Sequence, residues 1–340
     1  MKSTRQRGSR LSPVQVWEDL MAGAWRGQTL AAAVELDLFT QVAEGHITAQ
    51  KIAAAAGTSE PGTRRLLDAL AGIGYLKKAR QTYRLTPVAA EFLVRGKPFF
   101  MGSAATVGKM LAGAWANLAG VVREGRPLRT GMSEAEIQSF FAQLVPAIFT
   151  ASFTAASATV KSLPPAVRRR VRRILDVGAG SAAWSIPFAQ AIKESRVTVA
   201  DYPQVTQVTR EFTQRWGVAD RYDYLEGDFH QVDFGAGRFD LVILGHIVHG
   251  EGAEQGRRLL KRVFDALGEG GMLLIGEFIP NDDRSGPAMP LLFGLNMLIN
   301  TDSGDVFTLR EYREWLKAIG FKKVTTIPAP HVSPLILAIR

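Results

Sequence analysis

The sequence predicts an α/β protein with an open, Rossmann-like sheet in its second half and a smaller all-α, winged-helix domain before it. Strand and helix patterns alternate from Ile174 onward, which is typical of parallel strands joined by right-handed crossovers. The 340 residues, 46% hydrophobic and 21% charged, suffice for about two globular domains. We expect a basic flexible tail (1–13), a winged-helix domain (14–100), a helical connector that caps a pocket (101–165) and an α/β domain (166–340).

Capping and turn signals predict the winged helix. Thr48 and Ser59 each stand in an N-cap position before a short helical pattern, and Gly57 ends the first of the two helices. Segments 75–78 and 82–85 then form a two-stranded wing. The second helix is poor in base-reading side chains, and the preceding helices carry more large apolar residues than a small domain needs. We therefore expect this domain to pack against a second copy of the chain.

Composition and charge exclude several classes of function. The absence of cysteine excludes disulfides, Cys-zinc sites and thiol nucleophiles. Four positive charges lie in the first ten residues and five more are arginines between 168 and 173, so the net charge of +9 comes from two local clusters. We therefore expect no nucleic-acid partner. No window of roughly 18 uncharged apolar residues is evident, and we expect no membrane partner, no secretory signal and a cytoplasmic location.

Seven strands are predicted in the α/β domain. Because ligands of open α/β sheets bind beyond the carboxyl ends of the strands, the residues that follow each strand are the ones to inspect. We expect strands at 173–177, 197–201, 222–226, 239–244, 272–278, 323–327 and 335–339, with helices at 182–192, 204–216, 253–267, 290–299 and 309–319.

The ends of the first two strands indicate an adenosine-type ligand. Gly178 and Gly180 precede a helix, where backbone amides can approach a ligand and the helix start favours negative charge. Asp201 ends the second strand, 21 residues beyond Gly180, and its carboxylate can accept hydrogen bonds from both hydroxyls of a ribose. The same pattern also fits a nicotinamide dinucleotide, so a dehydrogenase stays open at this point.

The third and fourth strands add an adenine site and a base. Asp228 offers an acceptor for an exocyclic amine beside Phe229, whose ring can pack on a purine. His246 and His249 follow the fourth strand. We expect His249 to act as the functional base, with His246 as the alternative candidate; hydrogen-bonding roles in the structure remain open for both.

These motifs resemble the S-adenosylmethionine (SAM)-dependent small-molecule O-methyltransferases with an N-terminal winged-helix dimerisation domain, typified by plant caffeate and flavonoid enzymes and bacterial antibiotic-tailoring enzymes. The resemblance covers nearly the whole chain and rests on 175–180, Asp201, 227–229, His249 and 277–278, with weaker matches beyond. It implies a class I methyltransferase seven-stranded sheet with an antiparallel last strand. It also implies a homodimer whose partner helps to wall the substrate pocket.

The resemblance also implies roles for single residues. Gly178 and Gly180 would contact the methionine part of SAM, Asp201 the ribose, and Asp228 with Phe229 the adenine. His249 would be the base and Glu277 the acid that orients it, with S-adenosylhomocysteine (SAH) as the product. The residues that we expect to bind the cofactor are Asp176, Gly178, Gly180, Asp201, Tyr202, Gly227, Asp228, Phe229 and Gly245.

The expected acceptor is a small aromatic or heteroaromatic hydroxyl compound. A phenol with a pKa near 10 is mostly protonated at neutral pH, whereas an imidazole near 6.5 is mostly free to accept its proton. We expect an apolar pocket wall that suits a flat molecule. Its residues are Phe149, Phe153, Phe293, Asn296 and Met297. No set of histidines and carboxylates has ligand spacing along the sequence, so we predict no metal.

Two departures from the family pattern keep alternatives open. Gly250 and Glu251 follow His249 where the family usually has Asp and Trp, and Val306 stands where a second orienting acid is expected. N-methylation and C-methylation, which need less deprotonation, are therefore alternatives, as is a member that performs a non-methylating step. A SAM-sensing winged-helix regulator is the alternative from another class. A nicotinamide dehydrogenase is disfavoured because Asp228 has no required place in it.

Overall fold

The computed structural model describes residues 12–127, 133–329 and 333–340. All but the last two residues of the predicted basic tail lie outside the described residues. The chain divides into two compact units, the first ending at Thr106 and the second beginning at Val107. The segment 101–165, which we expected as a connector, is divided between them.

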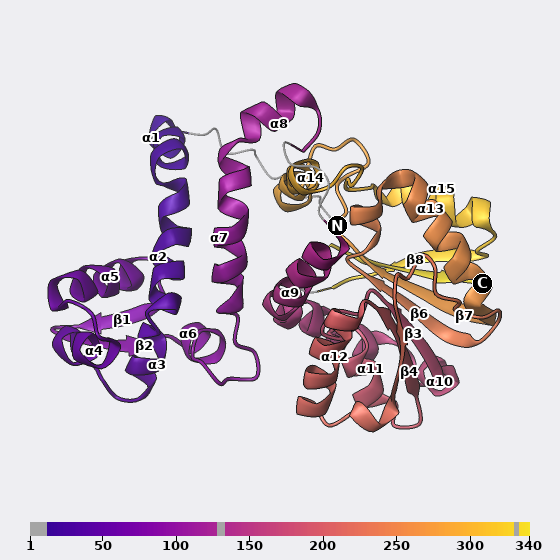
Figure 1. The fold of residues 1–340 in the computed structure, drawn as a ribbon, viewed down its shortest axis with the longest axis horizontal. Coiled ribbons are helices and arrows are strands. Elements are labelled where there is room, and N and C mark those ends of the chain that lie inside the picture. The colour runs from indigo at the N-terminus through magenta and orange to yellow at the C-terminus, as the bar shows by residue number, and fades with distance from the viewer. Residues whose placement is uncertain (1–11, 128–132, 330–332) are drawn as a thin grey trace, which may run out of the picture. The chain divides into compact units, whose positions relative to one another are not determined.

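The first unit is a winged helix preceded by further helices (Figure 1). Thr48 caps one helix by accepting a hydrogen bond from the Lys51 backbone N–H, and Gly57 ends that helix with φ +64°. The two strands of the wing pair antiparallel, with Leu76 opposite Leu85. The elements are α1 (Pro13–Trp17), η1 (Glu18–Ala22), α2 (Gly23–Glu35), α3 (Leu38–Ala43), α4 (Ala49–Ala56), α5 (Glu60–Gly72), β1 (Leu76–Ala79), β2 (Thr82–Leu85), α6 (Pro87–Phe92) and the start of α7 (Ser103–Ala116).

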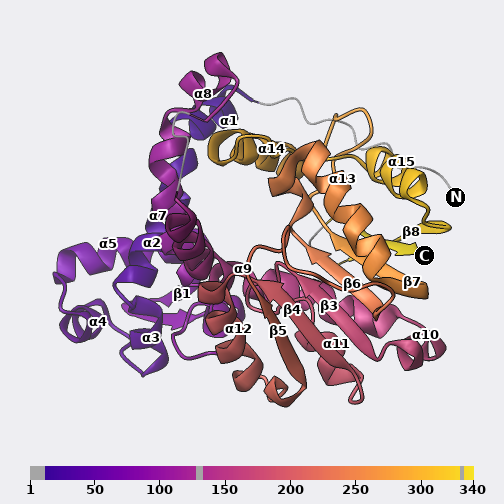
Figure 2. The ribbon, with the colours of Figure 1, turned by 45° about the vertical axis from the view of Figure 1, so that its right-hand side comes forward.

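The second unit alternates strands and helices, as the sequence predicts (Figure 2). Strands β3, β5, β8 and β9 have the predicted bounds, and the others differ at their ends. The elements after α7 are α8 (Leu118–Glu124), α9 (Glu134–Ser162), α10 (Pro165–Arg170), β3 (Arg173–Val177), α11 (Ile186–Ala191), β4 (Arg196–Asp201), α12 (Pro203–Arg215), η2 (Ala219–Arg221), β5 (Tyr222–Glu226), β6 (Phe239–Gly245), α13 (Val248–Ala266), β7 (Leu267–Gly276), α14 (Ala288–Asn300), α15 (Leu309–Ile319), β8 (Lys323–Ile327) and β9 (Leu335–Ile339).

The seven strands form one sheet in the order β5-β4-β3-β6-β7-β9-β8. The first five in this order are parallel, and β9 runs antiparallel to both β7 and β8, which confirms the predicted antiparallel last strand. Leu259 and Val263 of α13 and Leu316 of α15 are buried in a core with residues of β3, β6, β7 and β9. This arrangement brings the carboxyl ends of β3, β4, β5, β6 and β7 to one edge of the sheet.

The helix expected at 253–267 begins five residues earlier, at Val248. Two further differences in bounds concern the site. The helix expected at 182–192 begins only at Ile186, because Gly178, Gly180 and Ala182 have positive φ values that no α-helix accommodates. The strand expected at 272–278 runs instead from Leu267 to Gly276, because α13 passes directly into it with a register shift beside Phe239. Glu277 therefore follows the strand and is free to turn toward the site.

Helix α9 is long and apolar enough, by length and composition, to cross a membrane. The expectation that the chain has no such window was wrong on this point. In the structure α9 packs against α11 and α12, and Ala155 and Ala156 are fully buried. This packing gives the apolar side of the helix a place in the core of the second unit.

Candidate active site

The loop after β3 is shaped by its glycines. Gly178 and Gly180 have φ values of +61° and +57°, a region that favours glycine. A Cβ atom at Gly178 would lie 2.3 Å from Ile247 Cδ1, and one at Gly180 would lie 2.8 Å from Val145 Cγ1. The loop therefore has no room for side chains at either position, because Ile247 and Val145 pack directly against its backbone.

Asp201 ties this loop to the end of β4. Its Oδ2 accepts the Gly180 backbone N–H and its Oδ1 accepts the Tyr202 backbone N–H, both at 2.8 Å. Burial raises the pKa of Asp201 to about 6, while these two backbone hydrogen bonds oppose the rise. Each carboxylate oxygen keeps lone-pair capacity for a further donor.

Asp176 lies inside β3, and only 1% of its surface is exposed. Burial raises its pKa to about 7, with Ser185 lowering it by a hydrogen bond and Asp201 raising it by its charge. Its Oδ2 is buried without a hydrogen-bond partner in the described part of the chain. The structure thus buries Asp176, a predicted cofactor residue, in the strand that leads into the glycine loop.

The loop after β5 is joined to the same edge. The Gly227 N–H donates to the Asp201 carbonyl at 3.0 Å. Asp228 accepts from the His230 backbone N–H at 2.8 Å through Oδ1 and from the Gln231 side-chain amide at 3.1 Å through Oδ2. Phe229 packs against the sheet core. The structure therefore brings the predicted ribose and adenine residues together.

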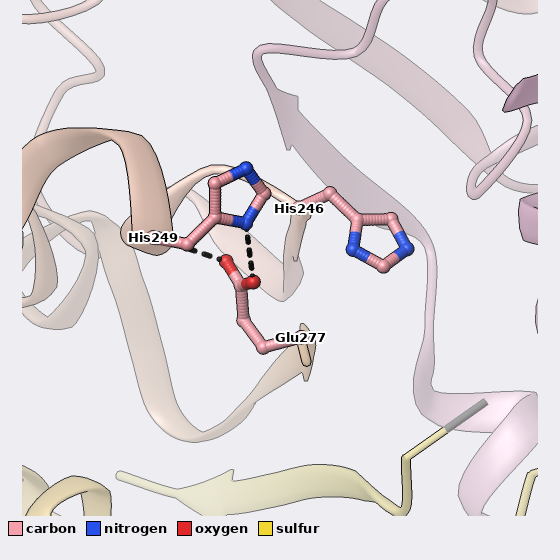
Figure 3. Close-up of side chains that lie close together, drawn as sticks. All are labelled: His246, His249 and Glu277. Atoms are coloured by element: carbon pink, nitrogen blue, oxygen red, sulfur yellow. Dashed lines mark hydrogen bonds and ion pairs between the residues drawn. The ribbon is translucent and has the colours of Figure 1, made fainter. Parts of the chain in front are cut away.

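His249 and Glu277 form a hydrogen-bonded pair although 28 positions separate them (Figure 3). His249 Nδ1 lies 2.6 Å from Glu277 Oε2, and the His249 backbone N–H donates to Oε1 at 3.3 Å. Burial alone would raise the pKa of Glu277, but the charge and hydrogen bonds of His249 hold it below its usual range. Because a carboxylate only accepts hydrogen bonds, Nδ1 carries the hydrogen, and in the neutral imidazole Nε2 is therefore the nitrogen with the free lone pair.

His246 lies beside this pair and makes no hydrogen bond to it (Figure 3). Its backbone has φ +63°, and its N–H donates to the Gly276 carbonyl at 2.8 Å. Burial lowers the pKa of His246 to about 4. The Nδ1 atom is buried and has no partner among residues 12–127, 133–329 and 333–340. The imidazole of His246 is therefore neutral over the physiological pH range.

His246, His249 and Glu277 offer ligand atoms that lie within 4.8 Å of one another, a group that could hold a metal ion. The sequence did not reveal this cluster, since Glu277 comes from a distant strand end. Two imidazoles and a carboxylate are a known donor set for zinc. Here the Glu277 carboxylate already accepts the Nδ1 hydrogen of His249, and the absence of a metal stays a prediction.

Two stacked phenylalanine rings lie against the His249 ring. Phe293 of α14 meets the His249 ring edge-on with a centroid distance of 4.8 Å, and it stacks on Phe278 at 3.9 Å. Sequence reasoning did not select Phe278, although its place directly after Glu277 was the available signal. On the same helix α14, the Asn296 side-chain oxygen accepts from Trp115 Nε1 at 3.1 Å, and Met297 is buried.

The other two predicted wall residues have packing roles. Phe149 and Phe153 of α9 lie in an aromatic cluster with Phe212 of α12 and with Trp216, where Phe153 stacks on Trp216 at 4.5 Å. Phe149 is 2% exposed. These contacts hold α9 on α12, because two large rings at helical spacing fill a core, and a place for the two rings in the pocket wall stays a prediction.

Gly245 packs against an indole ring. A Cβ atom there would lie 2.1 Å from Cδ1 of Trp184, so this glycine makes room for the indole ring, and its contact with a cofactor stays a prediction. Trp184 is buried and covers the ends of β6 and β7. Its aromatic side chain directly after the glycine loop was the signal that sequence reasoning passed over.

Comparisons with known proteins show the family of the chain. The model of the O-methyltransferase domain matches residues 115–322, and that of the O-methyltransferase dimerisation domain matches residues 18–95. The chain belongs to the O-methyltransferase family. This O-methyltransferase is a SAM-dependent enzyme, so the dehydrogenase and the regulator are set aside. Asp201, whose carboxylate keeps free lone-pair capacity beside the glycine loop, has the chemistry to accept the ribose hydroxyls of this cofactor.

Three relatives illustrate the likeness of this O-methyltransferase to known proteins. It is 34% identical to the 3-hydroxy-5-methyl-1-naphthoate 3-O-methyltransferase of Streptomyces sahachiroi, over 91% of this chain and 90% of that protein. It is 31% identical to a tetracenomycin polyketide synthesis 8-O-methyl transferase of Streptomyces glaucescens, over 88% of each. The structure of human N-acetylserotonin methyltransferase in complex with SAM has a TM-score of 0.83 and 25% identity, with 98% of this chain and 99% of that chain covered.

Proposed function

We propose that this enzyme transfers the methyl group of SAM to a hydroxyl oxygen of a small aromatic or heteroaromatic secondary metabolite, with His249 as the general base. The 2.6 Å contact between His249 Nδ1 and Glu277 carries the proposal, because it fixes the tautomer in which Nε2 can accept a proton. The naphthoate and tetracenomycin enzymes named above act on aromatic molecules, which supports this acceptor class.

When bound, SAM supplies a methyl group whose carbon is a strong electrophile, because that carbon is attached to a positively charged sulfonium sulfur. The acceptor O–H gives its proton to His249 Nε2 while the oxygen forms its bond to the methyl carbon, and the C–S electron pair leaves with the sulfur to give SAH. Glu277 stabilises the imidazolium that forms. Alignment of the reacting atoms supplies much of the rate, so the remaining residues serve to position.

His246 does not take this role in our proposal. A group whose pKa is about 4 is a poor acceptor for a phenolic proton at neutral pH. Methylation of nitrogen or carbon is the second candidate reaction, and one observation favours it: Val306 is buried where a second acid would stand, so His249 has a single orienting carboxylate. An N- or C-nucleophile would need that base less.

The cofactor roles are proposals of the same kind. Gly178 and Gly180 would contact the methionine part of SAM through their backbone, Asp201 would bind the ribose, and Asp228 with Phe229 would bind the adenine. The hydrogen bond from Gly180 to Asp201 and the one from Gly227 to the Asp201 carbonyl support a single continuous site. Tyr202 would contribute by holding Asp201.

The dimerisation domain indicates self-association, and we propose that its first helices form the contact. Trp17, Leu20 and Trp25 on η1 and its neighbouring helices α1 and α2 are 56%, 80% and 58% exposed, an apolar surface of the kind that an interface covers. In helix α5 the Arg64 side chain is paired with Asp68, which supports a domain without a nucleic-acid partner. We also propose a cytoplasmic location and no membrane partner.

Methyl transfer to hydroxynaphthoates tests the function directly. Product formation from SAM is followed by mass spectrometry for the wild type, His249→Gln and His246→Gln. We expect His249→Gln to lower kcat by about 10²-fold or more with SAH binding retained, and His246→Gln to have a smaller effect. Unchanged turnover in His249→Gln would remove the base role and support an N- or C-nucleophile.

A further inference from the structure

Glu251, one of the two residues that depart from the family pattern after His249, forms an ion pair. Its Oε2 lies 2.7 Å from Nε2 of His230, and the two side chains are 17% and 33% exposed. His230 belongs to the loop 227–232, which carries the proposed adenine residues, whereas Glu251 lies two residues after the proposed base. The pair therefore joins the two halves of the site that our proposed function uses.

Both partners are fixed on their own side of the contact. The His230 backbone N–H donates to Asp228 Oδ1, and its ring lies 4.6 Å from the Phe229 ring between centroids. Glu251 lies at the kink of α13 where Gly252 has φ +72°, and its carbonyl accepts from the Ser303 hydroxyl at 3.3 Å. The pair thus links the position of the loop 227–232 to the position of the turn that carries Glu251.

The loop has one further tie to α13. Arg262 donates through its guanidinium to the carbonyls of Phe229 and Val232. This tie does not involve the turn that carries His249, and it consists of hydrogen bonds to neutral carbonyls. Among the residues that the structure describes, only the His230–Glu251 contact joins a titratable group of the loop to the segment next to the proposed base.

We propose that His230 and Glu251 are positioning residues, which together hold the cofactor loop 227–232 against the turn of His249 and set the affinity for SAM and SAH. The inference rests on the proposed adenine role of this loop. A loop held in its binding conformation costs less free energy to order when the ligand arrives, so the pair strengthens cofactor binding without touching the cofactor.

Because His230 can gain or lose a proton, the strength of its contact with Glu251 depends on pH. The charged groups that face the ring are Glu251 and Arg262 from α13 and Asp228 from its own loop. The hydrogen bond to Glu251 raises the pKa of His230, burial opposes it, the charges of Glu251 and Asp228 add to the rise and Arg262 lowers it. The pair is therefore an ion pair below that pKa, and above it becomes a weaker hydrogen bond between a neutral imidazole and the Glu251 carboxylate.

Calorimetry with SAH at pH 6.0 and pH 9.0 tests the proposal on the full chain. The variants are Glu251→Gln, His230→Gln and the double variant, with Glu254→Gln as a matched control because Glu254 pairs with Arg258 on the exposed face of the same helix. We expect each single variant to weaken SAH binding about three- to fivefold at pH 6.0, and to have a smaller effect at pH 9.0. The double variant should equal the single ones, and the control should equal the wild type.

Kinetics provide a second measurement that a merely structural role would not reproduce. His249 is held separately by Glu277 and by the Asp305 N–H, which donates to the His249 carbonyl at 2.9 Å. The KM for SAM should therefore rise in the variants while kcat at saturating SAM stays within about twofold. Equal SAH affinity in wild type and both single variants, or additive losses in the double variant, would overturn the proposal. Failure of the wild type itself to bind SAH would instead refute the proposed function.

Discussion

Trp184 lies across the carboxyl ends of β6 and β7 because Gly276 has no side chain. A Cβ atom at Gly276 would lie 2.5 Å from Cη2 of Trp184, so the indole and the glycine fit only as a pair. The contact lies beside the strand end from which Glu277 leaves β7. The position of the orienting acid therefore depends on a packing relationship between two residues that do not themselves take part in the reaction.

The close fit between Trp184 and Gly276 predicts that a smaller side chain at position 184 compensates for a larger one at position 276. Gly276→Ala should lower the free energy of unfolding by about 1–3 kcal/mol, because the indole must move, and Trp184→Leu in the same chain should recover part of the loss. Urea unfolding followed by circular dichroism measures both. Gly72→Ala, at a glycine with open space around its Cβ position, is the control. If the double variant is less stable than the single Gly276→Ala variant, a clash with Trp184 is not the cause of the lost stability.

Glu277 should matter for turnover and not for cofactor affinity. Glu277→Gln keeps the shape of the side chain but removes the charge that stabilises the imidazolium of His249. We expect kcat to fall by about 10- to 100-fold while the dissociation constant of SAH stays the same. Steady-state kinetics measures kcat, and calorimetry measures the dissociation constant of SAH. A large loss of SAH binding would show that Glu277 supports the cofactor site rather than the base.

Asp176 should make stability depend on pH. The pKa of about 7 in the folded chain lies above the ordinary value of 3.8, so the folded protein keeps a proton that the unfolded chain releases. The free energy of unfolding therefore falls as the pH rises from about 4 to about 7. Asp176→Asn should remove this fall and stabilise the protein by up to about 4 kcal/mol at pH 8, with little effect at pH 4.

Urea unfolding across this pH range measures the Asp176 effect. Asp220→Asn, at a carboxylate that is 81% exposed, should leave the pH profile of the wild type unchanged. Asp201 adds a fall in the same direction between about pH 4 and about pH 6, so some slope should persist in Asp176→Asn. A profile of Asp176→Asn that runs parallel to the wild type would contradict the buried neutral carboxyl.

The first helices should control the oligomeric state. Leu20→Asp places a charge in the middle of an apolar surface formed with Trp17 and Trp25, and we expect it to weaken dimerisation by at least about 30-fold. Light scattering coupled to size-exclusion chromatography measures the mass of the particle. Glu18→Gln, on the same turn, should leave the dimer intact. A dimeric Leu20→Asp chain would move the interface to another surface.

The sequence by itself determined the class of fold, the order of the strands along the chain and the cofactor edge. Strand periodicity, the glycines at 178 and 180 and the acid at 201 are local signals, and they predict local structure because each depends on a few neighbouring residues. Family resemblance added His249 and Glu277 as the proposed base and its orienting acid. These predictions needed no knowledge of which segments meet in space beyond the rule that parallel strands end at one edge.

Only the tertiary structure decided which side chains touch. It assigned Phe149 and Phe153 to a core contact with α12, gave Gly245 to the indole of Trp184, and paired Glu251 with His230 across 21 positions of sequence. Such contacts depend on the packing of distant segments at atomic distances, and a one-residue change in where β7 ends is enough to alter them. No periodicity in a single sequence carries that information, because close packing is a property of the folded chain.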